Sequence, residues 1–419
     1  MKTTFSIKGR KILINGKLTY SEYEQCPENY RGLLMNMRMI QGIFDDRNDP
    51  ARFNRFGRIF DPERNTQELI RALPSWYAHG IRAITVGFQG GGSCFTIQSD
   101  TIDNNPFGED GSSIDKAYLR RMKAVIEAAD EIGMLVIVSY FYCGQSMRIK
   151  DDLAVLRAVK TASNWLRDQH FTNVIIEIAN EHDVESYSVH PVLYDGKGIA
   201  KLIETARRES GGMPVGCSTT GAYFSKEIGE ASDVILIHGN NMTRQVYYNH
   251  IQEAKAIVPE KPIITNEDSQ GLEQMQVALD QGVSWGYYNN MTKQEPPCDW
   301  GITRGEDEFF ARRLADSLGI TKNKLPLEEQ FYLQGLESEM VWEDKRWIRL
   351  ASMYPEKIQR VDFYRNEELF ATAYNDPFTI NYIVNWLQGP TDGVKQGERW
   401  RAEIYLTDGT LIQKEQVVE

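Results

Sequence analysis

Two glutamates occupy positions at which a carboxylate could do chemistry. Glu181 follows the apolar run Val174–Ile178 in the segment Ile-Ala-Asn-Glu, and Glu267 follows the run Pro262–Ile264 in the segment Ile-Thr-Asn-Glu. A charged residue at the end of a buried strand must be neutralised by a partner or be used. Two carboxyl groups ~5–5.5 Å apart can cleave a glycosidic bond, because one protonates the leaving oxygen while the other attacks the anomeric carbon. The competing interpretation is that each glutamate ends its strand in a salt bridge or a loop cap.

These two runs belong to a set of eight short apolar runs that alternate with amphipathic helical stretches. Buried strands alternating with helices predict a parallel sheet, and eight such units fit a TIM barrel. A doubly wound open sheet is the rival fold, but it should carry a Gly-rich phosphate loop after its first strand, and the sequence has none there. We therefore expect an α/β protein with a (β/α)8 TIM barrel. Its predicted strands are Gly32–Met35, Ala83–Val86, Leu135–Val138, Val174–Ile178, Pro214–Cys217, Val234–Ile237, Pro262–Ile264 and Val283–Trp285.

The connections differ in length on the two sides of the predicted strands. Helix-to-strand joints are brief, whereas three strand-to-helix joints are long, at residues 45–64, 89–113 and 289–306. Strand-to-helix loops gather at the C-terminal rim of a barrel, where barrel enzymes keep their active sites. The loop lengths therefore predict an active site at the same rim at which the two glutamates are expected.

Three regions are expected along the chain. Residues 1–27, with the turn Asn15-Gly16, read as an N-terminal β-hairpin that caps the barrel, and residues 28–335 as the catalytic barrel. From about residue 340 the pattern changes to short, alternating strands with turn signals between them. We expect residues 340–419 to form a small, Ig-like C-terminal β-sandwich as an accessory domain.

Composition excludes several classes of protein. The 419 residues carry 47 Lys plus Arg against 59 Asp plus Glu, a net charge of −12, which argues against nucleic acid or an anionic membrane as the main partner. No apolar window is long enough for a membrane span.

The five cysteines and six histidines show no metal-ligand spacing, so we expect no metal and no cofactor. No signal peptide is visible at Met1; the sequence as it stands predicts a cytoplasmic protein, or an exported one if a leader has been removed.

With these motifs in place, the chain resembles the clan-A glycoside hydrolases, closest in layout to the cellulase-like family 5. The resemblance runs over residues ~5 to ~320 and implies that Glu181 is the acid/base and Glu267 the nucleophile. Asn180 matches the residue that holds the sugar 2-hydroxyl, and His238 matches the strand-six histidine. Trp285 matches the stacking platform of the −1 subsite, where a non-prolyl cis peptide bond is often found.

The chain departs from that family at three helper positions, one of which is the strand-three His, replaced by the aromatic run Tyr140-Phe-Tyr142. Asn240 stands where a strand-six Tyr normally hydrogen-bonds the nucleophile, and Thr85 replaces the strand-two Arg. Arg38, which ends the first strand, could supply the missing positive charge. Tyr142 and Trp300 are candidates for lining the sugar subsites, with packing at the barrel top or within a loop as the alternative for each.

The sequence thus predicts a retaining β-glycoside hydrolase that cleaves a β-linked oligo- or polysaccharide by double displacement. A non-catalytic carbohydrate-binding relative of the same fold is the alternative, because Thr85 and Asn240 could mark lost turnover. A barrel lyase or metal hydrolase is a third reading, but the sequence lacks metal-ligand spacing.

Overall fold

A computed structural model describes residues 1–221, 224–321 and 324–419 of the chain. Its N-terminal hairpin consists of β1 (Phe5–Lys8), β2 (Lys11–Ile14) and β3 (Lys17–Leu18). The turn between the last two strands uses the left-handed backbone of Asn15 and Gly16, as the sequence predicts. Ile12 of this hairpin joins a buried cluster of strand residues and thereby closes one end of the strand bundle. That cluster consists of Ile12, Leu34, Ala83, Leu135, Ile137, Ile175, Val234, Leu236 and Ile264.

Eight parallel strands follow, each connected to the next through at least one helix, and together they give a mixed α/β fold. A six-stranded sheet has the order β11-β4-β5-β6-β7-β8, and β10 pairs with β9 in a second sheet. A single bridge between Ile264 and Ser284 joins the two sheets. Within the described residues no ladder joins β8 to β9, so the strands do not form the continuously hydrogen-bonded closed barrel that we expected. The strands are β4 (Asn36–Arg38), β5 (Ala83–Gly87), β6 (Leu135–Phe141), β7 (Val174–Ala179), β8 (Val215–Gly216), β9 (Ile235–His238), β10 (Ile263–Glu267) and β11 (Gly286–Tyr287).

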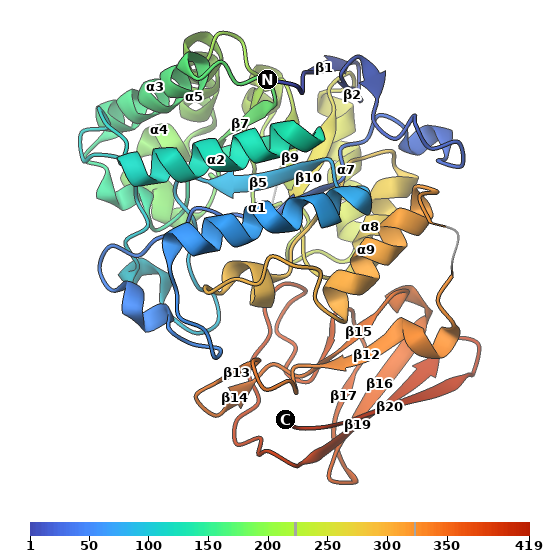
Figure 1. The fold of residues 1–419 in the computed structure, drawn as a ribbon. Helices are drawn as coiled ribbons and strands as arrows, with labels where there is room; N and C mark the ends of the chain where they lie inside the picture. Colours follow the sequence, from blue (N-terminus) through green and yellow to red (C-terminus); the bar gives the residue numbers. More distant parts are fainter. Residues whose placement is uncertain (222–223, 322–323) are drawn as a thin grey trace.

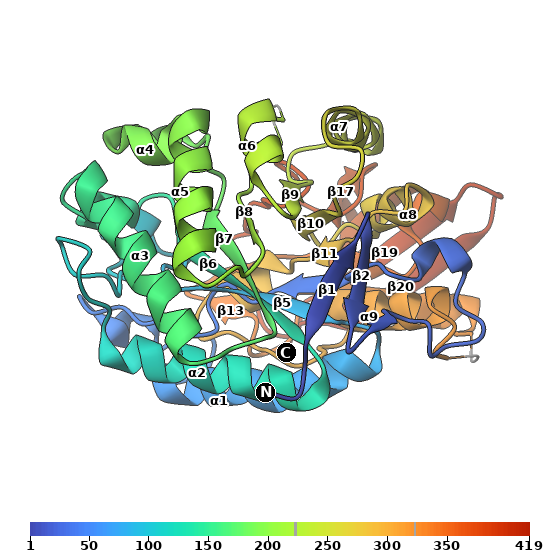
Figure 2. The same ribbon diagram turned by 90° about the horizontal axis from the view of Figure 1, so that it is seen from above.

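The helices lie around these strands (Figures 1 and 2). Their start points are set locally: Asp61 accepts a hydrogen bond from the Arg64 amide at the start of α1, and Asp151 caps α3 in the same way. Gly133 ends α2 in the left-handed conformation that glycine adopts readily. The helices are α1 (Pro62–Ala78), α2 (Lys116–Ile132), α3 (Asp152–Asp168), α4 (Pro191–Tyr194), α5 (Gly196–Glu209), α6 (Lys226–Ala231), α7 (Arg244–Ile257), α8 (Leu272–Asp280) and α9 (Glu306–Ser317).

Three long loops leave the C-terminal ends of the strands, as the sequence predicts. They are the β4–α1 loop (39–61), the β5–α2 loop (88–115) and the β11–α9 loop (288–305). The carboxyl ends of parallel strands lie at one edge, so these loops surround the ends of the strands that carry the two glutamates.

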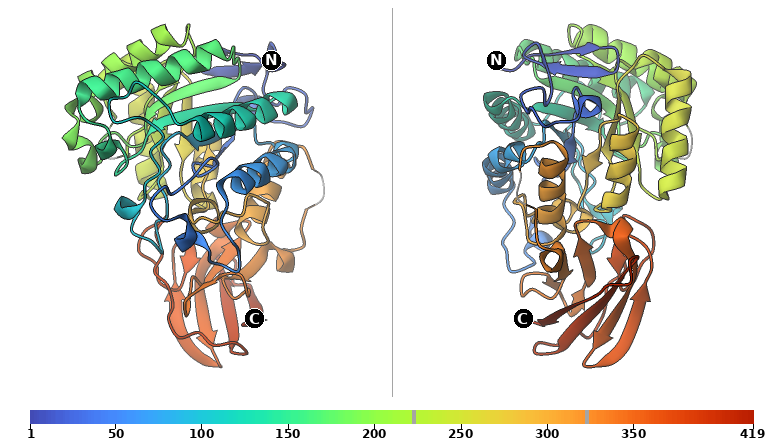
Figure 3. Two further views of the ribbon diagram at one scale, coloured as in Figure 1. Left: turned by 60° about the vertical axis from the view of Figure 1, so that its left-hand side comes forward. Right: turned by 90° about the vertical axis from the view of Figure 1, so that its right-hand side faces the viewer.

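The C-terminal part of the chain forms antiparallel sheets at the end of the molecule opposite the N-terminal hairpin (Figure 3). One sheet has the order β12-β15-β18 and another the order β17-β16-β19-β20, and β13 pairs with β14. A hydrophobic cluster that includes Leu333, Leu350, Phe363 and Trp400 contains residues from both larger sheets. The strands are β12 (Phe331–Gln334), β13 (Val341–Trp342), β14 (Lys345–Arg346), β15 (Arg349–Ser352), β16 (Ile358–Arg365), β17 (Glu368–Ala373), β18 (Phe378–Thr379), β19 (Arg399–Leu406) and β20 (Leu411–Val417).

Among the described residues, no helix combines the length and the apolar character that crossing a bilayer would require.

Candidate active site

An irregularity in strand β10 turns Glu267 toward the interior of the strand bundle. Thr265 pairs with Ile237, but Glu267 pairs with the very next residue, His238, so one extra residue is inserted at Asn266. Side chains alternate along a strand, and a bulge of this kind re-aims the side chain that follows it. As a result Asn266 and Glu267 both make interior contacts, Asn266 with Glu177 (2.9 Å) and Glu267 with Arg38 (2.6 Å).

The Glu267 carboxylate is held on both of its oxygens. Arg38 Nε lies 2.6 Å from Oε2, and Asn240 Nδ2 donates to Oε1 at 2.7 Å. Burial raises the pKa of Glu267, and the Arg38 and His238 cations together with the Asn240 hydrogen bond oppose that rise. The Glu267 anion raises the pKa of Arg38 in turn. Arg38 therefore places a positive charge beside one oxygen of Glu267, and Asn240 donates to the other.

Glu181 has a more open environment. It follows β7 with a left-handed backbone (φ 52°), and its amide donates to Ser218 Oγ at 3.1 Å. Its side chain is 18% exposed, against 6% for Glu267. Its carboxylate oxygen Oε1 lies 3.0 Å from His238 Nδ1. Glu181 can therefore exchange a proton with solvent more readily than Glu267 can.

The two carboxyl groups and His238 form one compact cluster. One oxygen from each glutamate and a ring nitrogen of His238 all lie within 4.8 Å of one another. His238 Nδ1 is 3.7 Å from Glu267 Oε2, and the two anions raise the pKa of His238 above 6.5 although burial opposes this.

Several buried donor groups at this cluster have no partner among the described residues, and two of them are the Asn180 amide and the Tyr288 hydroxyl. Asn180 Oδ1 accepts from Arg38 Nη2 at 2.6 Å, which fixes the amide and leaves Asn180 Nδ2 unsatisfied. The Tyr288 hydroxyl is also buried and unsatisfied, and its ring lies 5.5 Å from the Arg38 guanidinium carbon. Unsatisfied buried donors are costly, so a ligand hydroxyl would be favoured here.

Trp285 does not lie where the sequence analysis places it. Its ring is fully buried against Tyr287 and Phe310 of α9, and its indole N–H donates to Asp268 at 2.6 Å. Alternation explains this: Trp285 and Tyr287 face the helices, whereas Tyr288 is of opposite parity and faces the interior. The cis peptide bonds of the described chain both precede proline, so the expected cis bond at Trp285 is not found. The sequence analysis missed Tyr288, because alternation from an inward-facing Trp285 would select Tyr287 instead.

The remaining two candidates have different environments. Tyr142 follows β6, and burial raises the pKa of its phenol, with Glu267 and Glu181 acting in the same direction; it therefore lies near the cluster. Trp300 is buried between the β11–α9 loop and α1. Its N–H donates to Asn65 Oδ1 at 3.0 Å and its carbonyl accepts from Trp76 Nε1 at 2.8 Å. Trp300 thus packs within a loop, the alternative that the sequence analysis left open.

The same cluster is also the group of residues that could hold a metal ion in the described part of the chain. Two features disfavour that use. The Arg38 cation already lies on Glu267 Oε2, and a His238 whose pKa is raised is protonated over a wider pH range and then cannot ligate.

The sequence matches no protein-family model and no curated protein sequence. Among solved structures, a β-glucuronidase from Parabacteroides merdae is similar over 99% of this chain and 50% of its own, with 11% identity and a TM-score of 0.44. An endo-β-1,4-mannanase from Thermotoga petrophila is similar over 91% of this chain and 97% of its own, with 10% identity and a TM-score of 0.47. A β-mannanase from the blue mussel Mytilus edulis is similar over 76% and 96%, with 12% identity and a TM-score of 0.46. This chain spans about half the length of the β-glucuronidase.

Proposed function

We propose that this protein is a retaining β-glycoside hydrolase on a (β/α)8 barrel of the clan-A type, with Glu267 as nucleophile and Glu181 as acid/base. The observation that carries the proposal is the pair of carboxyl groups, with oxygens within 4.8 Å of each other, in two unlike environments. Glu267 is buried and held on both oxygens, which suits a nucleophile that must stay ionised and oriented. Glu181 is more exposed and contacts His238, which suits a group that gains and loses a proton in each cycle.

The mechanism follows from these roles in two steps. A Glu267 carboxylate oxygen bonds to the anomeric carbon while the bond from that carbon to the leaving oxygen breaks, and the Glu181 proton passes to the leaving oxygen. Glu181, now ionised, takes a proton from water as the water oxygen bonds to the anomeric carbon and the ester to Glu267 breaks. Two displacements preserve the configuration, and no metal or cofactor is required.

The neighbouring residues have supporting roles in this proposal. Arg38 and Asn240 orient Glu267, and His238 lies between the two carboxyl groups. The free Asn180 amide donor is placed for a sugar hydroxyl, and Tyr288, instead of Trp285, lines the ring-binding position together with Tyr142.

The proposal extends to the organisation of the chain and its partner. We assign residues 1–27 to a capping hairpin and 340–419 to a sandwich-type accessory domain. The catalytic barrel, which we expected over residues 28–335, ends before Phe331, because β12 (Phe331–Gln334) pairs with β15 of the C-terminal sheets. The substrate is a β-linked oligo- or polysaccharide, in keeping with the acidic net charge of −12, which disfavours nucleic acid.

A hydrolysis screen tests the proposal. Aryl β-glycosides of glucose, galactose, mannose, xylose, glucuronic acid and fucose are offered to the wild type, to Glu267→Ala and to the exposed control Glu185→Ala. We expect release from at least one glycoside, retained in the control and reduced by at least ~10³-fold in Glu267→Ala.

If no aryl glycoside is cleaved, the same variants are compared on β-linked polysaccharides, and the release of reducing ends is measured. Polysaccharide binding without hydrolysis, unchanged in Glu267→Ala, would instead establish the non-catalytic carbohydrate-binding protein. The hydrogen bond from Asn240 to Glu267 and the charge of Arg38 weigh against that alternative, since both compensate for the missing family residues.

A further inference from the structure

The loop that follows β9 carries two of the residues that contact the catalytic carboxyl groups. His238 ends the strand and Asn240 comes two residues later, with Gly239 between them. This turn has little regular structure of its own, and Asn241 adopts a left-handed backbone (φ 63°) that costs a non-glycine residue energy. Within the turn the Gly239 amide donates to the Glu267 carbonyl at 3.0 Å, and further support comes from outside it.

That support comes from residue 385, in the C-terminal part of the chain. Asn385 Oδ1 accepts from the Asn241 amide at 2.7 Å. Asn385 Nδ2 lies 3.2 Å from the Gly239 carbonyl and 3.4 Å from the Met242 carbonyl, and 3.2 Å from Gln274 Oε1. The Asn385 side chain is only 6% exposed. It thus meets polar groups on both sides of Asn240 and replaces the water that an unsupported turn would need.

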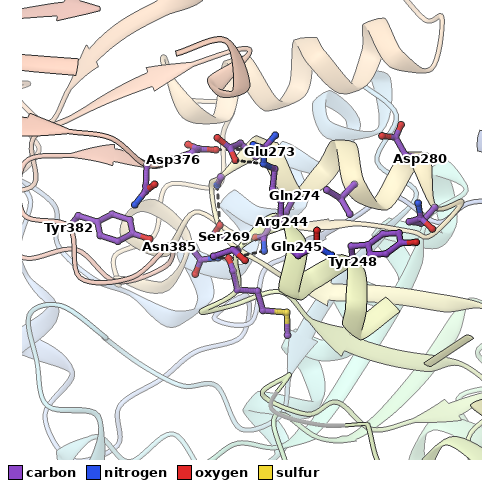
Figure 4. A pocket seen from close by; sticks show the side chains of 16 residues that line it. Arg244, Gln245, Tyr248, Ser269, Glu273, Gln274, Asp280, Asp376, Tyr382 and Asn385 are labelled. Carbon is purple, nitrogen blue, oxygen red and sulfur yellow. Dashed lines mark hydrogen bonds and ion pairs between the residues drawn. The ribbon is translucent and has the colours of Figure 1, made fainter. Parts of the chain in front are cut away.

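Neighbouring contacts reinforce this junction. Gln274 of α8 donates to the same two carbonyls, those of Gly239 (3.1 Å) and Met242 (3.2 Å). Trp386 Nε1 donates to Asn241 Oδ1 at 2.9 Å. Asn385 and Gln274 lie in the wall of a cavity of about 620 Å³ between α7, α8 and the C-terminal part (Figure 4). Beside this cavity, these hydrogen bonds connect the C-terminal part of the chain to the β9 turn.

We propose that Asn385 is a positioning residue of the active site: by fixing the β9 turn it holds Asn240 on the Glu267 carboxylate. The inference rests on the proposed function for the role of Glu267. It assigns the C-terminal part of the chain a share in the catalytic geometry, beyond carbohydrate binding or support of the barrel. Small misplacements of a catalytic contact cost up to ~10²-fold in rate, so the effect should be measurable.

A double-mutant cycle tests this route. Asn385→Ala, Asn240→Ala and the double variant are compared, with Asn381→Ala as the matched control. Asn381 lies in the same C-terminal segment, but the hydrogen bonds of its side chain within the described residues go to Pro390 and Thr391. We expect Asn385→Ala to lower kcat by ~10- to 100-fold with KM changed less than ~3-fold, and Asn381→Ala to leave both unchanged.

The double variant distinguishes positioning from general damage. If Asn385 acts through Asn240, adding Asn385→Ala to Asn240→Ala lowers kcat by less than ~3-fold more. Full multiplication of the two effects, or an Asn385→Ala variant with wild-type kcat, would overturn the proposal. Should Asn385→Ala not fold, Asn385→Leu keeps the size of the side chain and removes both its donor and its acceptor.

A readout that needs no turnover separates this inference from the proposed function. The pKa of His238 is followed by NMR in the wild type and in Asn385→Ala. The charged and titratable groups that face His238 are Glu181, Glu267, Arg38, Asp268 and His250. A loosened turn weakens the contacts of His238 with the two glutamates, so its pKa should fall toward 6.5 in Asn385→Ala and stay unchanged in Asn381→Ala. An unchanged pKa in Asn385→Ala would contradict the proposal even if no glycoside were cleaved.

Discussion

At the scale of single residues, two carboxyl groups of the same type acquire different properties from their neighbours. Glu267 has a guanidinium on one oxygen and an amide donor on the other, and it is nearly buried. Glu181 has one imidazole neighbour and partial exposure. These unlike environments support the proposed division of the roles of nucleophile and acid/base between them.

The acid/base role of Glu181 predicts a specific rescue. Glu181→Ala should slow hydrolysis of an aryl glycoside with a good leaving group by ~10²–10⁴-fold, because water loses its general base in the second step. Azide needs no general base, so adding it should restore turnover and yield a β-glycosyl azide. The product is identified by NMR. An inverted, α-configured azide, or no response to azide in a folded and substrate-bound variant, would assign Glu181 another role.

His238 makes stability depend on pH in a defined direction. Its folded-state pKa lies above 6.5, so the folded protein binds this proton more tightly than the unfolded chain does. The stabilisation is complete below the unfolded pKa and is lost as the pH rises through the folded pKa. The unfolding free energy of the wild type minus that of His238→Gln should therefore be larger at about pH 6 than at about pH 9. Urea unfolding at several pH values measures it, and a difference that grows with pH would contradict this account.

At the scale of elements, the strand ends aim the catalytic groups and the rim loops enclose them. A buried carboxylate, Glu295 of the β11–α9 loop, ties three loops together. It accepts the amides of Cys94 (2.6 Å) and Phe95 (2.7 Å) from the β5–α2 loop, and it pairs with Arg55 (2.9 Å) of the β4–α1 loop. These contacts join the three loops to one another on one side of the rim.

Glu295→Gln should destabilise the protein strongly, because it leaves the Arg55 side chain, 3% exposed, without its counter-charge. We expect a loss of about 3–5 kcal/mol in the free energy of unfolding, measured by urea. The exposed control Glu185→Gln should stay within about 0.5 kcal/mol of wild type. Adding Arg55→Met should restore part of the loss, and a double variant no more stable than Glu295→Gln would show that the charge pairing is not the cause.

At the scale of the whole molecule, the sequence predicts what depends on local pattern. Glu181, Glu267 and Arg38 were chosen because each comes three residues after the end of an apolar run, a pattern that is visible in the sequence itself. Trp285 was misplaced because its position depends on which way each strand faces. Asn385 was not foreseen at all, because it meets the β9 turn from about 145 residues away along the chain.

The junction between the parallel strands and the C-terminal sheets contains a second buried link. Arg349 of β15 binds both oxygens of Glu306 at the start of α9, at 2.6 and 2.7 Å, and both residues are buried. Glu306 also accepts from Asn289 at 3.2 Å, next to Tyr288 of the site. We therefore expect the two parts of the chain to unfold together.

Arg349→Met should lower the free energy of unfolding by about 3–5 kcal/mol, because it leaves Glu306 charged and buried. Arg399→Met, which removes an exposed pair with Glu415 on the same C-terminal sheets, should cost at most about 1 kcal/mol. Calorimetry of the wild type should show one unfolding transition. Two separated transitions, with only one of them moved by Arg349→Met, would show that the parts unfold independently.

The central claim is that Glu267 forms a covalent bond to the sugar. The most direct measurement is peptide mass mapping after incubation with a 2-deoxy-2-fluoro β-glycoside of the accepted sugar, which slows release of the intermediate. We predict one sugar per chain, attached at Glu267, and release of the normal substrate's product first as the β-anomer. Turnover without any adduct and with the α-anomer as the first product, or an adduct on another residue, would contradict the account.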